Sequence, residues 1–208
     1  MNEFIPSSDR TPEKDPRIAY FDKHAPRWIE YNSPEEVLTR FDAMKDELGI
    51  APGRNVLEIG CGPGQFTGWI CEQVAPGKVM ATDFSPAMIA EACKQSLSAE
   101  FMVSDICSEA PAVKAFHTAF CYNSFPHFRD KARALKNIAK TLKPGGVLII
   151  LHFAGREALN NMHSQFGGPV QNDHLLEHEE MEKLIISAGF KIDIFKDESD
   201  LYFIRAQK

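Results

Sequence analysis

A turn rich in glycine joins a predicted buried strand to a predicted helix, and its residue types are suited to binding a ligand. Residues 56–67 read VLEIGCGPGQFT, with Gly60, Gly62 and Gly64 in the turn. Glycine lacks a Cβ atom and tolerates positive φ, so its backbone can approach a ligand closely. The start of the following helix offers unpaired N–H groups and a partial positive charge. The turn alone therefore predicts a site for a nucleoside, a nucleotide or a phosphate.

The spacing of the glycines and the acidic residue Glu58 argue against one class of ligand, the dinucleotides. In the dinucleotide fingerprint G-x-G-x-x-G the third glycine comes one residue later, at the position of Gln65 in this chain. Glu58, at the end of the predicted strand, would repel a pyrophosphate but would suit a ligand with a cationic amino group. A nicotinamide oxidoreductase is therefore disfavoured as an interpretation.

Two further carboxylates follow the next two predicted strands. Asp83 ends the strand predicted at 78–82, and Asp105 follows the strand predicted at 99–104. Asp83 lies about twenty residues beyond the turn, where an acid in dinucleotide-binding folds accepts hydrogen bonds from ribose hydroxyls. Ligands of open α/β sheets bind at the carboxyl ends of the strands. Glu58, Asp83 and Asp105 are therefore expected at one ligand, although Asp83 could instead serve as a capping or turn residue.

Residues 56–67 resemble motif I of the class I S-adenosylmethionine-dependent methyltransferases. The segments TDFSPAMIAEA at 82–92 and LKPGGVLIILHF at 142–153 resemble the same family, so the resemblance covers most of the chain. It implies S-adenosylmethionine as the cofactor, with adenine contacts near Asp105 and Ile106; core packing is an equal alternative for Met88. The cofactor-binding residues that it implies are Glu58, Gly60, Cys61, Gly62, Gly64, Asp83, Phe84, Met88, Asp105 and Ile106.

The predicted fold is α/β. The resemblance implies a Rossmann-like, doubly wound sheet of seven strands in the order 3-2-1-4-5-7-6, with the last strand antiparallel and helices on both faces. Residues 1–16 contain Pro6, Pro12 and Pro16 and are expected to form a flexible leader. Residues 17–208 are expected to form a single methyltransferase domain, in which 154–176 is a lid-like insertion.

The acceptor pocket is expected to draw on three segments. Residues 20–31 resemble the entry helix of small-molecule methyltransferases, including the ubiquinone and menaquinone type, although its aromatic residues could equally pack on the core. The loop 123–128 lacks the [DN]-P-P-[YF] tetrad of methyltransferases acting on adenine, cytosine or glutamine, which argues against those acceptors. A solvated polar face is the alternative for the insertion. The substrate-pocket candidates are Tyr20, His24, Trp28, Cys121, Asn123, Arg156 and Asn160.

Histidines are the candidate catalytic residues. Methyl transfer needs no protein nucleophile, but an acceptor that must lose a proton needs a base, and histidine suits this task near neutral pH. His127 is the first candidate, followed by His152 and His163. His152, His163 and His174 are spaced eleven apart, which matches no compact metal-ligand pattern, so no metal is expected.

The bulk composition restricts the partners and the compartment. The chain has 208 residues and a net charge of -6, with no basic region of the kind that binds nucleic acid. Its five cysteines form no C-x-x-C pair, and no apolar run approaches the roughly 18 residues of a membrane span. We expect a cytoplasmic protein with a small-molecule acceptor and no membrane span. The alternatives are transfer to a thiol, metalloid or metal-bound centre, or non-catalytic cofactor binding; oligomeric state stays open.

Overall fold

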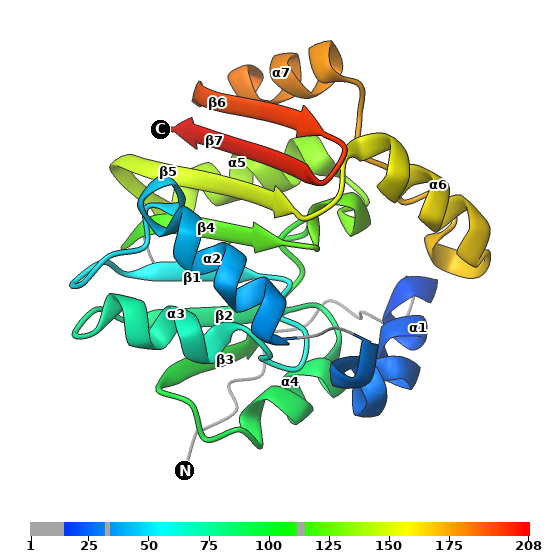
Figure 1. Ribbon diagram of the computed structural model, residues 1–208, viewed down its shortest axis with the longest axis horizontal. Coiled ribbons are helices and arrows are strands. Elements are labelled where there is room, and N and C mark those ends of the chain that lie inside the picture. Colours follow the sequence, from blue (N-terminus) through cyan, green and yellow to red (C-terminus); the bar gives the residue numbers. More distant parts are fainter. Residues whose placement is uncertain (1–14, 32–33, 112–114) are drawn as a thin grey trace. The chain divides into compact units, whose positions relative to one another are not determined.

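The computed structural model describes residues 15–31, 34–111 and 115–208, so most of the leader expected at 1–16 lies outside the described residues. The seven strands form one mixed sheet in the order β3-β2-β1-β4-β5-β7-β6 (Figure 1), which confirms the predicted strand order. The chain comprises two compact units, Met1–Asp105 and Ile106–Lys208, which we call the N-terminal and C-terminal units. The single domain expected over 17–208 stays a prediction.

The N-terminal unit contains three parallel strands. Their bounds are β1 Val56–Ile59, β2 Val79–Asp83 and β3 Ala99–Val103. Residue Ile59 is level with Thr82, and Asp83 is level with Val103, so the carboxyl ends of the three strands lie at one edge. Every residue of β1 is buried, including the acidic Glu58. This edge carries the glycine turn, Glu58 near the end of β1 and Asp83 at the end of β2.

Five helical segments accompany these strands. They are α1 Pro16–His24, η2 Ala25–Tyr31, α2 Pro34–Leu48, α3 Thr67–Val74 and α4 Pro86–Cys93. Helix α1 ends at His24, and the chain continues through Pro26 as the 3-10 helix η2, because proline cannot continue a regular α-helix. Both α1 and η2 pack against α4. Helix α4 begins as its sequence predicts: Ser85 accepts a hydrogen bond from the Met88 amide at 3.1 Å, and Pro86 occupies the first turn.

The C-terminal unit contains the other four strands. Their bounds are β4 Phe116–Tyr122, β5 Leu142–His152, β6 Lys191–Glu198 and β7 Leu201–Gln207. Strand β5 is parallel to β4 and antiparallel to β7, and β6 and β7 form the expected terminal hairpin. Residues 143–146, KPGG, are typical of a turn, but β5 already begins before them, at Leu142. These residues form an irregularity of register within the β4–β5 pair, because Phe116 is level with Leu142 but Thr118 with Val147.

The helical segments of this unit are η3 Phe125–His127, α5 Lys131–Thr141, α6 Arg156–Phe166, η4 Gly168–Val170 and α7 His178–Ser187. Helix α5 has a sharp division between apolar and polar sides, and Ala134, Leu135 and Ile138 are fully buried. The insertion expected at 154–176 contains helix α6, followed by the glycine-rich turn of η4. Its action as a lid stays a prediction.

Replacing Gly77 by alanine should destabilise the fold strongly. A Cβ atom at Gly77 would fall on the carbonyl oxygen of Arg54 and lie 2.8 Å from that of Val74, and backbone atoms cannot swing aside as a long side chain can. We expect a loss of about 1–3 kcal/mol or more in the free energy of unfolding, measured from urea unfolding curves.

Gly53→Ala is the matched control. Gly53 has φ +79°, but a Cβ atom at this position would have no neighbour within 4 Å, so that variant tests backbone strain without a clash. It should cost only about 1 kcal/mol. Equal losses in the two variants would contradict a steric role for Gly77.

Candidate functional site

The glycine turn is attached to the end of β2 by backbone and carboxylate hydrogen bonds. Gly60 and Cys61 both donate their amide hydrogens to the Thr82 carbonyl, at 2.7 and 3.0 Å. Asp83 accepts from the Gly62 amide at 2.9 Å with one oxygen and from the Ser85 amide at 2.9 Å with the other. The φ angle of Gly62 is +55°, a conformation that L side chains rarely adopt. Glycine and aspartate together therefore fix the shape of the turn.

Two buried acids lie at this edge of the strands. Glu58 accepts a 2.6 Å hydrogen bond from the Thr67 hydroxyl, yet burial raises its pKa to about 8, with Asp83 adding to the shift. Burial also raises the pKa of Asp83 to about 6, although the Ser85 and Gly62 amides oppose the rise and Asp22 adds to it. A cation or a set of hydrogen-bond donors that binds beside Glu58 and Asp83 would therefore stabilise their ionised forms and lower their pKa values.

Asp105 and Ile106 follow β3. The Ser104 amide donates to the Asp83 carbonyl at 2.9 Å, so the chain leaves β3 beside the end of β2. Asp105 comes next and is partly exposed. Ile106 is the first residue of the C-terminal unit and is buried, and its carbonyl accepts from the Asn137 side chain at 2.9 Å.

Aromatic and sulfur-containing side chains surround the turn in the N-terminal unit. A Cβ atom added at Gly62 would lie 3.8 Å from the Trp28 ring and 4.0 Å from the Met88 sulfur. Phe21 contacts the rings of both Trp28 and Phe84, with centroids 5.5 and 5.4 Å apart. Trp28 thus lies beside Gly62, and its role in an acceptor pocket stays a prediction. Met88 is 1% exposed, a burial that also fits the core-packing alternative.

The remaining predicted residues of this unit have local partners. Cys61 is buried with Ala81 and Ile89, and burial raises its pKa well above the ordinary thiol value. Tyr20 and His24 pair with each other: the His24 Nδ1 atom lies 2.6 Å from the Tyr20 carbonyl, and the two rings are 4.4 Å apart.

Asp22 was not predicted as a site residue. It accepts from the Ser85 hydroxyl at 2.5 Å and from the Ala87 amide at 3.2 Å, so it attaches α1 to the start of α4. It holds the entry helix next to the residues that brace the glycine turn. Sequence separations of 63 and 65 residues gave no local signal for these contacts.

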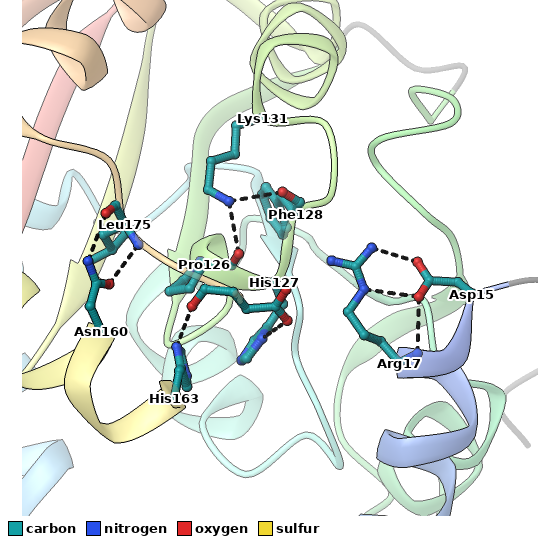
Figure 2. Close-up of polar contacts among 10 residues, drawn as sticks. Asp15, Arg17, Pro126, His127, Phe128, Lys131, Asn160, His163 and Leu175 are labelled. Atoms are coloured by element: carbon teal, nitrogen blue, oxygen red, sulfur yellow. Dashed lines mark hydrogen bonds and ion pairs between the residues drawn. The ribbon is translucent and has the colours of Figure 1, made fainter. Parts of the chain in front are cut away.

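In the C-terminal unit, Asp173 joins two of the predicted histidines. Its carboxylate lies 2.8 Å from His127 Nδ1, and its backbone carbonyl lies 2.5 Å from His163 Nδ1. The two imidazole rings are 5.0 Å apart, and Figure 2 shows them side by side, with His127 on η3 and His163 on α6. Asp173 is 7% exposed. We call His127, His152, His163 and Asp173 the histidine cluster.

His152 completes this cluster from the end of β5. It is 1% exposed, and within the part of the chain that the structure describes its Nε2 atom has no hydrogen-bond partner. Burial lowers its pKa to about 3, and the neighbouring His127 and His163 contribute to the shift. Burial also lowers the pKa of His163, with His127 adding to the decrease and Asp173 opposing it. His152 is therefore uncharged at neutral pH.

The other candidates of this unit have different surroundings. Arg156 forms ion pairs with Glu177 at 2.7 Å and Asp197 at 3.4 Å. Asn160 uses its amide for two hydrogen bonds with the backbone of Leu175, at 3.0 and 2.9 Å (Figure 2). Arg156, Asn160 and His163 all lie on α6. The side chains of Arg156 and Asn160 nevertheless contact other residues rather than His163. Their roles as acceptor contacts stay predictions.

Cys121 and Asn123 lie at the end of β4. Cys121 is fully buried, and burial raises its pKa, so its thiol is not activated. Asn123 has φ +50° and is exposed, and its amide donates to the Leu151 carbonyl at 3.1 Å.

Within residues 15–31, 34–111 and 115–208, no group of three or more histidine, cysteine, aspartate or glutamate side chains could hold a metal ion. Likewise, none of the described helices is long and apolar enough to cross a membrane.

This chain resembles known methyltransferases. A family model described as a methyltransferase domain matches residues 56–146, which include the glycine turn, Asp83 and the His127 loop. Residues 56–146 therefore form a methyltransferase domain, and the curated relatives reported below are methyltransferases. These matches support the predicted family and S-adenosylmethionine as the cofactor, and the strand order confirms the predicted fold class.

Two curated relatives of this chain align with it over different shares of their own lengths. An O-methyltransferase of Aspergillus sclerotiorum, resE, is 26% identical over 193 residues, which cover 85% of this chain and 71% of the relative. Phosphoethanolamine N-methyltransferase 1 of Zea mays is 26% identical over 169 residues, which cover 78% of this chain but only 33% of the relative. This chain therefore aligns with only about a third of the length of the Zea mays protein.

Solved structures share the fold of this methyltransferase. The DhpI complex with S-adenosylhomocysteine has a TM-score of 0.71 at 19% identity and covers 96% of this chain and 98% of its own. A methyltransferase of Aquifex aeolicus has a TM-score of 0.65 at 20% identity and covers 96% and 99%. At these identities the likeness supports the fold alone, so the roles of individual residues depend on the geometry described above.

Proposed function

We propose that this methyltransferase transfers the methyl group of S-adenosylmethionine to a small-molecule acceptor by in-line displacement. The observation that carries the proposal is the glycine turn braced by Asp83, with the buried acid Glu58 beside it. The names of two relatives, an O-methyltransferase and a phosphoethanolamine N-methyltransferase, support an acceptor of small-molecule type.

The residues at the glycine turn suit the parts of the cofactor. Asp83 is buried and already accepts two backbone hydrogen bonds, and each carboxylate oxygen can accept another, which fits the two ribose hydroxyls. A cationic ligand would favour the charged form of Glu58, whose pKa burial raises. Phe84 and Met88 follow Asp83 and would flank the adenine, and Asp105 would accept from the adenine amine. These assignments are part of the proposal.

The chemistry requires positioning rather than a protein nucleophile. The acceptor lone pair forms a bond to the methyl carbon while the carbon–sulfur bond breaks, and the bonding pair stays on sulfur. The protein contributes by holding the reactants in line and by excluding water. Electron density shifts onto the sulfonium during transfer, so the positive charge on the sulfur atom disappears.

Cofactor binding should strengthen as the pH rises from 5 to 8. Without cofactor, the raised pKa values keep a proton on Glu58 up to about pH 8 and on Asp83 up to about pH 6. A bound cation and ribose hydroxyls favour the ionised forms, so binding releases protons and becomes tighter as the pH approaches 8. We expect a gain of at least about tenfold in affinity, which corresponds to one unit of pKa difference.

Calorimetric titrations at several pH values, in buffers of different ionisation enthalpy, measure both the affinity and the proton release. In the Glu58→Gln variant the dependence above pH 6 should disappear, which separates Glu58 from ionisations of the cofactor itself. Proton uptake by the unmodified protein at pH 7 would contradict this assignment.

The in-line mechanism is tested with a cofactor whose methyl group is chiral through its hydrogen isotopes. Incubation with a whole-cell extract, which contains small metabolites, proteins and nucleic acids, should place the methyl group on a small molecule with inverted configuration. Retention of configuration would indicate two successive displacements and contradict the mechanism. Label recovered only in protein or nucleic acid would contradict the small-molecule acceptor.

A further inference from the structure

The histidine cluster lies within the C-terminal unit and is held by the segment around η4. The Asp173 amide donates to the Val170 carbonyl at 3.0 Å, which fixes the backbone of Asp173. From this position its carboxylate reaches His127 and its carbonyl reaches His163. Lys131 adds a charge nearby, but its ammonium donates to the carbonyls of Pro126 and Phe128, at 2.9 and 3.1 Å (Figure 2).

The partners of the imidazole rings determine their tautomers. A backbone carbonyl can only accept, so His163 Nδ1 must carry the hydrogen in its contact with Asp173. An ionised carboxylate is likewise an acceptor only, so His127 also carries its hydrogen on Nδ1. A neutral imidazole with a hydrogen on Nδ1 presents a lone pair on Nε2. His127 and His163 therefore both present a basic Nε2 atom.

Burial separates the three candidate bases. His152 is 1% exposed and His163 is 5% exposed, and in both rings burial lowers the pKa and makes proton uptake costly. His127 is less deeply buried, and it alone has a carboxylate at its Nδ1 atom among the histidines of the cluster. A carboxylate in that position fixes the tautomer and stabilises the imidazolium that forms when Nε2 takes a proton.

We propose that Asp173 positions His127 as the general base, and that the methyl acceptor is a compound whose accepting atom carries a proton at neutral pH, such as a hydroxyl. In the balanced step, the acceptor atom gives its proton to His127 Nε2 and its lone pair to the methyl carbon. The carbon–sulfur bond breaks, leaving neutral S-adenosylhomocysteine, and the imidazolium later loses its proton to solvent. A carboxylate acceptor would need no such base. The acceptor class rests on the proposed methyl transfer, whereas the tautomer of His127 does not.

The experiment measures histidine tautomers by long-range ¹H–¹⁵N correlation spectra of the full chain labelled with ¹⁵N-histidine. Signals of His127 are assigned with His127→Gln. We expect His127 in the Nδ1–H form in the unmodified protein. In Asp173→Leu, the Nδ1–H fraction should fall to the level of the chain unfolded in urea. Asp193→Asn, which alters another carboxylate of the same unit, should leave it unchanged. Asp173→Ala replaces the leucine variant if circular dichroism shows that the latter does not fold.

Release of S-adenosylhomocysteine with catechol, phosphoethanolamine and trans-aconitate as probes tests the acceptor class. Transfer to a proton-bearing probe should fall at least about 30-fold in kcat in Asp173→Leu, with KM nearly unchanged. An Nε2–H tautomer of His127 in the unmodified protein, or equal kcat in the variant, would overturn the positioning role. Transfer to trans-aconitate alone would overturn the acceptor class. Loss of S-adenosylmethionine binding in a calorimetric titration would instead overturn the proposed function and leave the tautomer result standing.

Discussion

Replacing Asp83 by alanine should weaken S-adenosylmethionine binding about 10- to 100-fold. The variant loses the proposed acceptor for the ribose hydroxyls, and a hydrogen bond to a charged group contributes about 1.5–3 kcal/mol. It also leaves the amides of Gly62 and Ser85 without the carboxylate that they contact in the structure. Isothermal calorimetry on protein shown to be folded by circular dichroism gives the affinity.

The same titration distinguishes the two roles considered for Asp83. If Asp83 serves only as a turn residue, the variant should be less stable while its folded fraction binds the cofactor with unchanged affinity. That outcome would contradict ribose binding. Asp46→Ala is the control, because Asp46 is exposed on α2 of the same unit, and its cofactor affinity should match that of the unmodified protein.

Replacing His127 by alanine should lower the turnover number about 100- to 10,000-fold, the usual contribution of a general base, for an acceptor that must lose a proton. Cofactor affinity should stay nearly intact, because none of the proposed cofactor contacts involves His127. Release of S-adenosylhomocysteine measures turnover, and calorimetry measures cofactor affinity. The two readouts separate a chemical role from a binding role.

His178→Ala is the matched control for that variant. His178 lies at the start of α7, in the same unit, and stacks on Phe195 with ring centroids 4.0 Å apart. We expect its loss to leave turnover unchanged. Unchanged turnover in the His127 variant would remove His127 from the mechanism.

The glycine turn and Asp83 could be predicted from the sequence because their signals are local. A buried strand, a run of glycines and an acid after the next strand each occupy a few neighbouring positions, and parallel pairing brings their ends to one edge. Ser85 and Pro86 predicted the start of α4 for the same reason. The order of the strands came from the resemblance to the family rather than from any of these patterns.

The contacts made by Asp22 and Asp173 could not be predicted in this way. Asp173 meets His127 across a separation of 46 residues, and Asp22 meets Ser85 across 63, so only tertiary packing brings each pair together. Neither aspartate stands out among the polar residues of its own segment. A carboxylate partner for His127 could have been anticipated, but the sequence does not say which acid supplies it.

The spacing of residues along a helix does not show which residues their side chains contact. Asn160 and His163 lie on the same helix, α6, yet the Asn160 amide hydrogen-bonds with the Leu175 backbone. The turn at 143–146 shows a similar limit. The sequence KPGG at 143–146 is typical of a turn. Strand β4 pairs with Leu142 before this segment and with Val147 after it, so β5 begins at Leu142 and contains the segment as an irregularity of register.

The central claim, that the glycine turn and its acids bind S-adenosylmethionine, is tested most directly by calorimetric titration of the purified chain. S-adenosylmethionine, NAD⁺ and NADP⁺ are each titrated at pH 8, where the account predicts the tightest cofactor binding. We expect saturable binding of S-adenosylmethionine at one site per chain and none of either dinucleotide. Binding of NAD⁺ or NADP⁺ without binding of S-adenosylmethionine would contradict the account.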